Sequence, residues 1–250
     1  WPKGLEREMN TLVGFRANFS LTDSGRPRLE MTAWYSYRIS LNGKFVGYGP
    51  ARGPKGFFRP DTWDQSSAAV KGSNDLLIEV AGYNVPNYYL MEQLPFLQAS
   101  VTVGNRVVAE TRAEGGAFCA VLMPRVRKTV RYSYQRTFSE YYRLPASGKD
   151  EPLPLAKMPR PKKIERRVPY PDFELSDLVP VSFARVREDL SAPTKAGRTL
   201  MRPAEGGWFK GWTMDELELN SIFLAQRLVY AERRPASDAD LTRSSFVFRP

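Results

Sequence analysis

Short runs of β-branched and aromatic residues fill the first 145 residues of the chain, and polar turn residues separate them. In several runs apolar and polar positions alternate, which is the pattern of a strand with one buried face. Many short strands at this spacing predict an all-β sandwich. We predict strands at residues 11–21, 28–41, 44–48, 75–81, 96–103, 106–110, 117–122 and 129–138.

Two dipeptides predict tight turns between neighbouring strands. Asn42-Gly43 and Gly104-Asn105 each stand between two of the predicted runs. Asn and Gly tolerate a positive φ, which two-residue hairpin turns require. The sequence therefore predicts a hairpin at each of these places.

The pattern changes after residue 145, and we expect three regions: 1–145, 146–180 and 181–250. Residues 146–180 are rich in proline and hold few periodic apolar positions, which predicts a linker or an ordered wrap. Residues 181–250 read as an incomplete second β-rich region. Within it, Thr213 to Glu216 has the form of a helix capping box, whereas the apolar alternation from Leu217 to Val229 favours a strand. Both interpretations stay open.

Histidine is absent from the 250 residues, and Cys119 is the single cysteine. This composition excludes Ser-His-Asp and Cys-His nucleophile systems, His-ligated zinc and an internal disulfide. We therefore expect no catalytic residue, no metal site and no cofactor in this chain, with a structural calcium ion left open. A binding or structural module is favoured over an enzyme.

The formal net charge is +10, so nucleic acid has to be considered as a partner. The first basic cluster alternates with apolar residues, as the outer face of a strand would, and the second lies among prolines as in a solvated linker. Solvated surface is the favoured interpretation of both, so we do not expect nucleic acid, and a polyanion-binding surface protein remains the weaker alternative. No apolar run is long enough to predict a membrane span. The clusters are Arg125, Arg127, Lys128, Arg131 and Arg136, and Lys157, Arg160, Lys162, Lys163, Arg166 and Arg167.

Two loops hold the candidate functional residues, one between residues 41 and 64 and one after residue 82. Aromatic faces stack on sugar rings and charged side chains bind sugar hydroxyls, but the same residue types also suit docking against another domain. The candidates for carbohydrate binding or domain docking are Arg52, Lys55, Phe57, Arg59, Trp63, Tyr83, Asn84, Asn87, Tyr88 and Tyr89.

Pairs of acidic residues are candidate catalytic groups, because glycoside hydrolysis needs only two carboxyl groups. Asp61 and Asp64 flank Trp63 at a predicted turn, where Asp caps backbone N–H groups. Asp215 and Glu216 suit a helix N-terminus. Structural roles are favoured for all four.

Three segments in order, residues 42–54, 58–64 and 77–84, resemble the N-terminal β-sandwich of bacterial α-L-rhamnosidase-like glycoside hydrolases. The similarity continues through residues 131–136 and 140–143, so it covers about residues 10–145. The resemblance implies a jelly-roll domain of galactose-binding type, within an enzyme whose catalytic acids lie in a later α/α-barrel. No catalytic residue of the family can be carried over to this chain.

The leading hypothesis is a non-catalytic N-terminal part of such an enzyme, which braces the catalytic domain of the same polypeptide and holds carbohydrate. The alternative is a free-standing carbohydrate-binding module. Because the chain begins at Trp1 and stops at Pro250 within a strand-like run, we expect a longer polypeptide. A periplasmic or extracellular location is expected with it.

Overall fold

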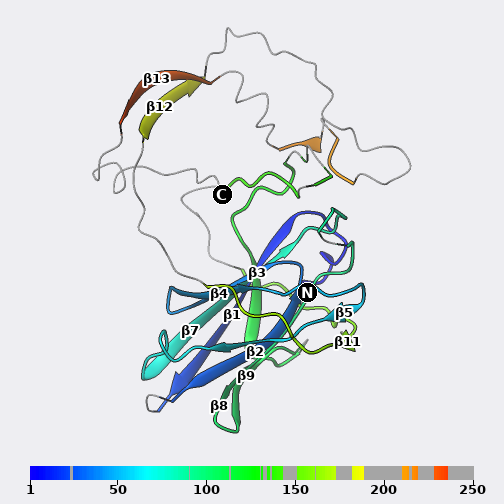
Figure 1. Ribbon diagram of the computed structural model, residues 1–250, viewed down its shortest axis with the longest axis vertical. Helices are drawn as coiled ribbons and strands as arrows, with labels where there is room; N and C mark the ends of the chain where they lie inside the picture. The colour runs from blue at the N-terminus through cyan, green and yellow to red at the C-terminus, as the bar shows by residue number, and fades with distance from the viewer. Residues whose placement is uncertain are drawn as a thin grey trace. The chain divides into compact units, whose positions relative to one another are not determined.

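Two antiparallel sheets form the first part of the computed structural model (Figure 1). The chain divides into two compact units, residues 1–170 with 201–219 and residues 171–200 with 220–250. Strands account for nearly all regular structure in the described residues, which confirms the predicted all-β class. The structure describes residues 1–22, 25–89, 91–112, 114–129, 131, 134–135, 137–142, 151–160, 162–172, 182–188, 210–213, 216–218 and 228–235.

The larger sheet has five strands, and its two longest strands lie near its centre. β1 (Thr11–Leu21) pairs with β7 (Gly72–Gly82) along its whole length, with Thr11 opposite Gly82 and Leu21 opposite Gly72. All neighbouring strands are antiparallel. The order across the sheet is β10 (Phe118–Leu122), β1 (Thr11–Leu21), β7 (Gly72–Gly82), β3 (Tyr37–Leu41) and β4 (Lys44–Gly49).

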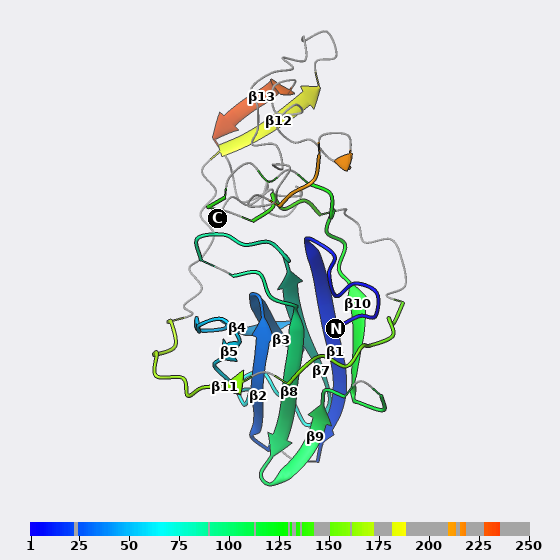
Figure 2. The same ribbon diagram turned by 90° about the vertical axis from the view of Figure 1, so that its right-hand side faces the viewer.

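The smaller sheet has four strands in the order β6 (Asp61–Asp64), β2 (Pro27–Trp34), β8 (Phe96–Val103) and β9 (Arg106–Glu110). Alternate residues of β2 and β8 face the core in register, with Leu29 opposite Val101 and Met31 opposite Ala99. All four of these side chains are buried. Figure 2 shows the layer formed by β2, β8 and β9 lying against the longer sheet.

Most predicted strands are observed, and the differences have local causes. The predicted strand 28–41 is two strands, because the chain leaves the smaller sheet after Trp34 and enters the larger sheet at Tyr37. β5 (Phe57–Phe58) and β6 were not predicted, since Arg59 and Pro60 interrupt them. The described residues between 129 and 138 include no strand, and residues 130, 132, 133 and 136 lie outside the description.

Both predicted hairpin turns are observed, with different backbone conformations. Asn42 and Gly43 both have positive φ, at 52° and 75°. This is the condition for a type I′ turn. At the second turn the positive φ belongs to Gly104, at 58°, and Val103 pairs with Arg106. Gly at the first central position is typical of a type II′ turn.

The described residues 151–160 and 162–170 of the proline-rich segment bond to other parts of the first unit, and we call them the wrap. Leu153 N–H donates to the carbonyl of Ala120 at 2.8 Å, and Ala156 N–H donates to the carbonyl of Trp1 at 2.8 Å. Further along, β11 (Lys162–Lys163) pairs with β5 in parallel. In Figure 2 this yellow-green segment crosses β8 on its way to β5. Residues 146–150, 161 and 173–180 of the predicted region lie outside the described part.

The wrap is anchored by a buried ion pair. Asp61 is fully buried, and its carboxylate accepts hydrogen bonds from the Tyr37 hydroxyl and the Arg166 guanidinium. The Tyr170 hydroxyl accepts a hydrogen bond from Thr62 N–H at 2.7 Å. Arg166 belongs to the second basic cluster, which was predicted to be a solvated linker. That prediction is wrong for Arg166.

The first basic cluster also differs from its prediction as an outer strand face. Arg125 and Arg131 are 8% and 3% exposed. Arg125 pairs with Glu140 at 3.5 Å, and Arg131 donates to the carbonyl of Lys210 at 2.7 Å. Both guanidinium groups donate hydrogen bonds to backbone carbonyls inside the unit. An alternating sequence pattern cannot distinguish such buried arginines from arginines on the outer face of a strand. Arg136 lies outside the described residues.

The second unit contains an antiparallel pair, β12 (Ser182–Glu188) and β13 (Leu228–Pro235). Val229 lies in β13, so of the two interpretations left open for this segment the strand holds at that residue, while residues 219–227 lie outside the description. In the first unit, Thr213 N–H donates to Glu216 Oε2 at 2.8 Å, which is one half of the predicted capping box. The other half is not formed, because Glu216 N–H donates to the Thr213 carbonyl and the Thr213 hydroxyl donates to Glu216 Oε2. Asp215 lies outside the described residues. No helix in the described residues has the length and apolar character needed to cross a membrane.

Candidate functional site

The two loops predicted to carry function meet in the structure. The Arg52 guanidinium carbon lies 4.8 Å from the centroid of the Tyr89 ring. Gly56 N–H donates to Gln93 Oε1 at 2.7 Å. Residues separated by more than thirty positions in sequence therefore form one surface.

Exposed apolar side chains gather in these loops. Tyr88, Tyr89 and Met91 are 68%, 57% and 50% exposed, and Leu94 and Phe57 are also exposed. Asn87 Oδ1 accepts a hydrogen bond from Tyr89 N–H at 2.7 Å, which fixes the turn that presents the two tyrosines. We name Arg52, Phe57, Tyr88, Tyr89, Met91 and Leu94 the loop patch. Lys55 is exposed in the turn before Phe57.

Three of the candidate residues are buried, and their described contacts are with the protein itself. Trp63 donates from Nε1 to the Tyr37 hydroxyl at 3.1 Å. The Tyr83 ring packs edge-on against Tyr35 at 5.9 Å. Asn84 has a positive φ of 51°, and its Nδ2 donates to the carbonyl of Glu8 at 2.7 Å. These contacts hold the two loops on the sandwich.

Arg59 links the first loop to the wrap. Its Nε donates to the carbonyl of Arg52 at 2.9 Å, and its guanidinium also donates to the carbonyl of Glu165. The side chain therefore positions Arg52 beside Tyr89.

Burial controls the electrostatics beneath the loop patch. It raises the pKa of Tyr35 to about 12, because a buried phenolate would lose its hydration. Burial and the neighbouring Asp61 carboxylate raise the pKa of Tyr37 well above its usual range. Burial lowers the pKa of Arg131. Within the described ranges, no group of three or more His, Cys, Asp or Glu side chains could hold a metal ion.

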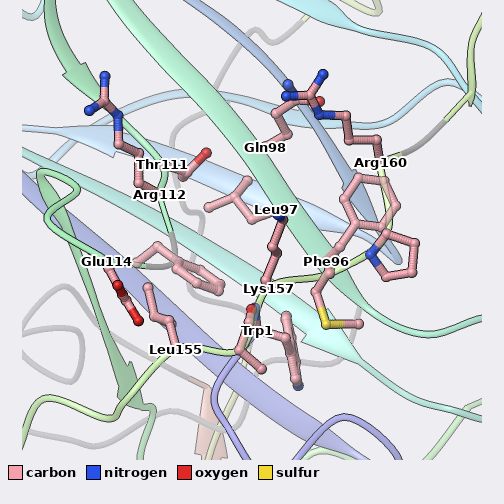
Figure 3. Close-up of a pocket in the computed structure, with 14 residues that line it drawn as sticks. Trp1, Phe96, Leu97, Gln98, Thr111, Arg112, Glu114, Leu155, Lys157 and Arg160 are labelled. Carbon is pink, nitrogen blue, oxygen red and sulfur yellow. The ribbon is translucent and has the colours of Figure 1, made fainter.

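A cavity of about 410 Å³, which the sequence did not predict, lies where the wrap passes β8 (Figure 3). Its lining includes Phe96 to Gln98 on β8, Thr111 and Arg112 after β9, Trp1, and residues 155–160 of the wrap. The lining segments are far apart in sequence, so no local motif indicates the cavity. The apolar residues Leu155 and Met158 among prolines were the only local sign that the wrap packs on something.

Comparison with solved structures gives similarity in fold. The GH78 family rhamnosidase of Bacillus sp. GL1 matches 76% of this chain at a TM-score of 0.61 and 22% identity, over 22% of its own chain. The α-L-rhamnosidase from Dictyoglumus thermophilum matches 72% of this chain at a TM-score of 0.44 and 16% identity, over 20% of its own chain. No protein-family model matches, and no curated protein sequence gives a significant match.

The predicted resemblance to the rhamnosidase family is thus confirmed for the fold. The chain spans about a fifth of the length of these two rhamnosidase chains.

Proposed function

We propose that this chain is a non-catalytic β-sandwich part of a larger α-L-rhamnosidase-like glycoside hydrolase, and that it braces the catalytic domain. The observation that carries the proposal is the likeness of its fold to about a fifth of the Bacillus enzyme. The absence of histidine and the structural roles of Asp61 and Arg166 fit a part that performs no catalysis. A periplasmic or extracellular location belongs to the same proposal.

The loop patch is the surface that we assign to docking against the rest of the polypeptide. Large exposed apolar side chains gathered in one place are typical of interaction surfaces. Tyr, Arg and Met are enriched at interfaces, and the stacked pair of Arg52 and Tyr89 combines two of these residue types.

The first experiment is to measure the intact mass of the polypeptide from its native source and to assay it on an aryl α-L-rhamnoside. We expect a mass well above 28.4 kDa and turnover by the complete polypeptide, with none by residues 1–250. A native mass of 28.4 kDa would contradict the proposal and would favour the alternative, a free-standing carbohydrate-binding module.

The docking role is tested by the double substitution Tyr88→Ser and Tyr89→Ser. We expect a lower Tm in the complete enzyme and an unchanged Tm in the isolated chain, because the rings are exposed in the chain alone. Tyr48→Ser is the matched control, since Tyr48 is 53% exposed on β4, outside the loop patch. Equal effects on both proteins would show that the rings serve the sandwich itself.

Carbohydrate binding at the loop patch is the second candidate function. Tyr88 and Tyr89 offer exposed aromatic faces, and Arg52 offers hydrogen-bond donors beside one of them. Calorimetry of the chain with rhamnose and galactose tests it. Heat that disappears in the Tyr88→Ser, Tyr89→Ser variant is expected, and no heat at millimolar sugar would reject this function.

A further inference from the structure

The cavity beside the wrap is preformed, because its wall is held by backbone hydrogen bonds. Ala156 N–H donates to Trp1 at 2.8 Å, and Lys3 N–H donates to the carbonyl of Pro154 at 2.8 Å. A volume of about 410 Å³ is within the usual range for small-molecule sites, about 300–1,000 Å³. A second hollow of about 90 Å³ shares Gln98 and Thr111 with it and extends to Lys163.

The lining is apolar in part, and its exposed charged residues are Arg112, Lys157 and Arg160 with one carboxylate, Glu114. Trp1, Phe96, Leu97 and Leu155 contribute apolar surface. Lys157 and Arg160 are exposed and have no hydrogen-bond or ion-pair partner among the described residues.

Lys157 and Arg160 outnumber the one carboxylate of the lining, and neither forms an ion pair with it in the described structure. Arg112 is paired with Glu110, and Thr111 Oγ1 accepts a hydrogen bond from Ala99 N–H at 3.0 Å. Glu114 is the carboxylate among the described lining residues. Gln98, Arg112 and Arg160 all line the cavity drawn in Figure 3.

We propose that this cavity binds a small organic carboxylate with one or two rings. A ring with an apolar face fits the lining, and a carboxylate supplies the acceptors that Lys157 and Arg160 lack in the described structure. An acidic sugar and an aromatic acid share this chemistry. The proposal does not depend on the proposed function, since no rhamnoside or docking partner enters it.

The test is titration of the 250-residue chain with glucuronic acid and with 4-hydroxycinnamic acid, by calorimetry and by amide chemical shifts. Glucose and 4-hydroxycinnamyl alcohol are the neutral counterparts. We expect at least one acid to bind about tenfold more tightly than its counterpart, with shifts at Gln98 and Thr111. The acid that binds shows whether the natural ligand is an acidic sugar or an aromatic acid.

Arg160→Gln and Lys157→Gln are each expected to weaken binding of that acid by about 3- to 10-fold, as expected when a charge-assisted hydrogen bond is lost. Lys71→Gln is the matched control, because Lys71 is an exposed lysine outside the lining. Sodium chloride raised from 50 to 300 mM should also weaken binding. Equal binding of the neutral compounds, no heat with either acid at 10 mM, or unchanged affinity in both lining variants would overturn the proposal.

Discussion

Tyr35 lies fully buried between the ends of β2 and β3, where an ionised side chain is strongly disfavoured. Its ring contacts Trp34 and Tyr83, and its hydroxyl accepts a hydrogen bond from Gln93 N–H at 3.3 Å. Because burial raises the pKa of this hydroxyl to about 12, the neutral phenol persists in the folded chain after an exposed tyrosine has ionised.

This shift predicts a loss of stability at alkaline pH. An unfolded tyrosine titrates near pH 10, so between pH 10 and about 12 the unfolded chain binds fewer protons than the folded chain. The free energy of unfolding therefore falls as pH rises through this window. A shift of about two pKa units corresponds to about 2–3 kcal/mol.

The variant Tyr35→Phe should lose about 2 kcal/mol less than the parent chain between pH 10 and 12, because phenylalanine cannot ionise. Denaturant unfolding at pH 8, 10, 11 and 12 measures the difference. Tyr37 has a raised pKa in both proteins, so it cancels in the comparison. Parallel losses in the two proteins would contradict the assignment to Tyr35.

At the scale of elements, the wrap depends on one buried charge pair near its end. The side chains of Arg166 and Asp61 are 9% and 0% exposed. Arg166 also lies over the Tyr170 ring, at 3.9 Å from its centroid. Removing one partner of a buried pair leaves the other charge uncompensated, which costs about 3–5 kcal/mol.

Arg166→Gln should therefore release the wrap from β5 and make β11 accessible to proteases. We expect trypsin to cleave after Lys162 or Lys163 about a hundredfold faster or more in this variant, because such cleavage follows the population of the locally open state. Mass spectrometry of the fragments measures the rate. Arg167→Gln is the control, since Arg167 is exposed and pairs with the exposed Glu165. Equal cleavage rates in the two variants would show that the ion pair does not hold the wrap.

The sequence predicts elements whose signal is local and misses those defined by distant partners. Residues 11–21 and 96–103 alternate clearly, and the observed strands have these bounds. β5 has only two residues, and its partner β11 lies about a hundred positions away. No short window of sequence contains that pairing.

The same contrast between local sequence signals and contacts with distant segments holds for single residues of the candidate site. Tyr88 and Trp63 are both aromatic residues in loop-like sequence, yet one is 68% exposed and the other 6%. Arg125 and Arg160 are both in basic clusters, but Arg125 is buried against backbone carbonyls. Composition identifies which side chains could bind a ligand, whereas burial depends on contacts between distant segments.

At the scale of the whole molecule, the net charge of +10 overstates the charge that a polyanion would meet. Arg125, Arg131 and Arg166 are used inside the first unit. Of the described cations at the surface, Arg112, Lys157 and Arg160 line the cavity beside the wrap, which is too small for a duplex.

We therefore expect weak binding of duplex DNA or heparin, limited to the non-specific range of about 10⁻⁴–10⁻⁶ M and lost between 50 and 200 mM salt. Fluorescence anisotropy with a labelled duplex at both salt concentrations measures this. A dissociation constant below about 1 μM at 200 mM salt would instead support the polyanion alternative.

The backbone hydrogen bond from Ala156 N–H to the Trp1 carbonyl also has a consequence for the order in which the first unit folds. The five-stranded and the four-stranded sheets of the first unit are complete by residue 122, but one wall of the cavity comes from residues 155–160. During synthesis the N-terminal part of a chain is available to fold first, and contacts distant in sequence form against a larger loss of chain entropy. The sandwich can therefore form with Trp1 still uncovered, and the cavity arises only when the later segment closes over it.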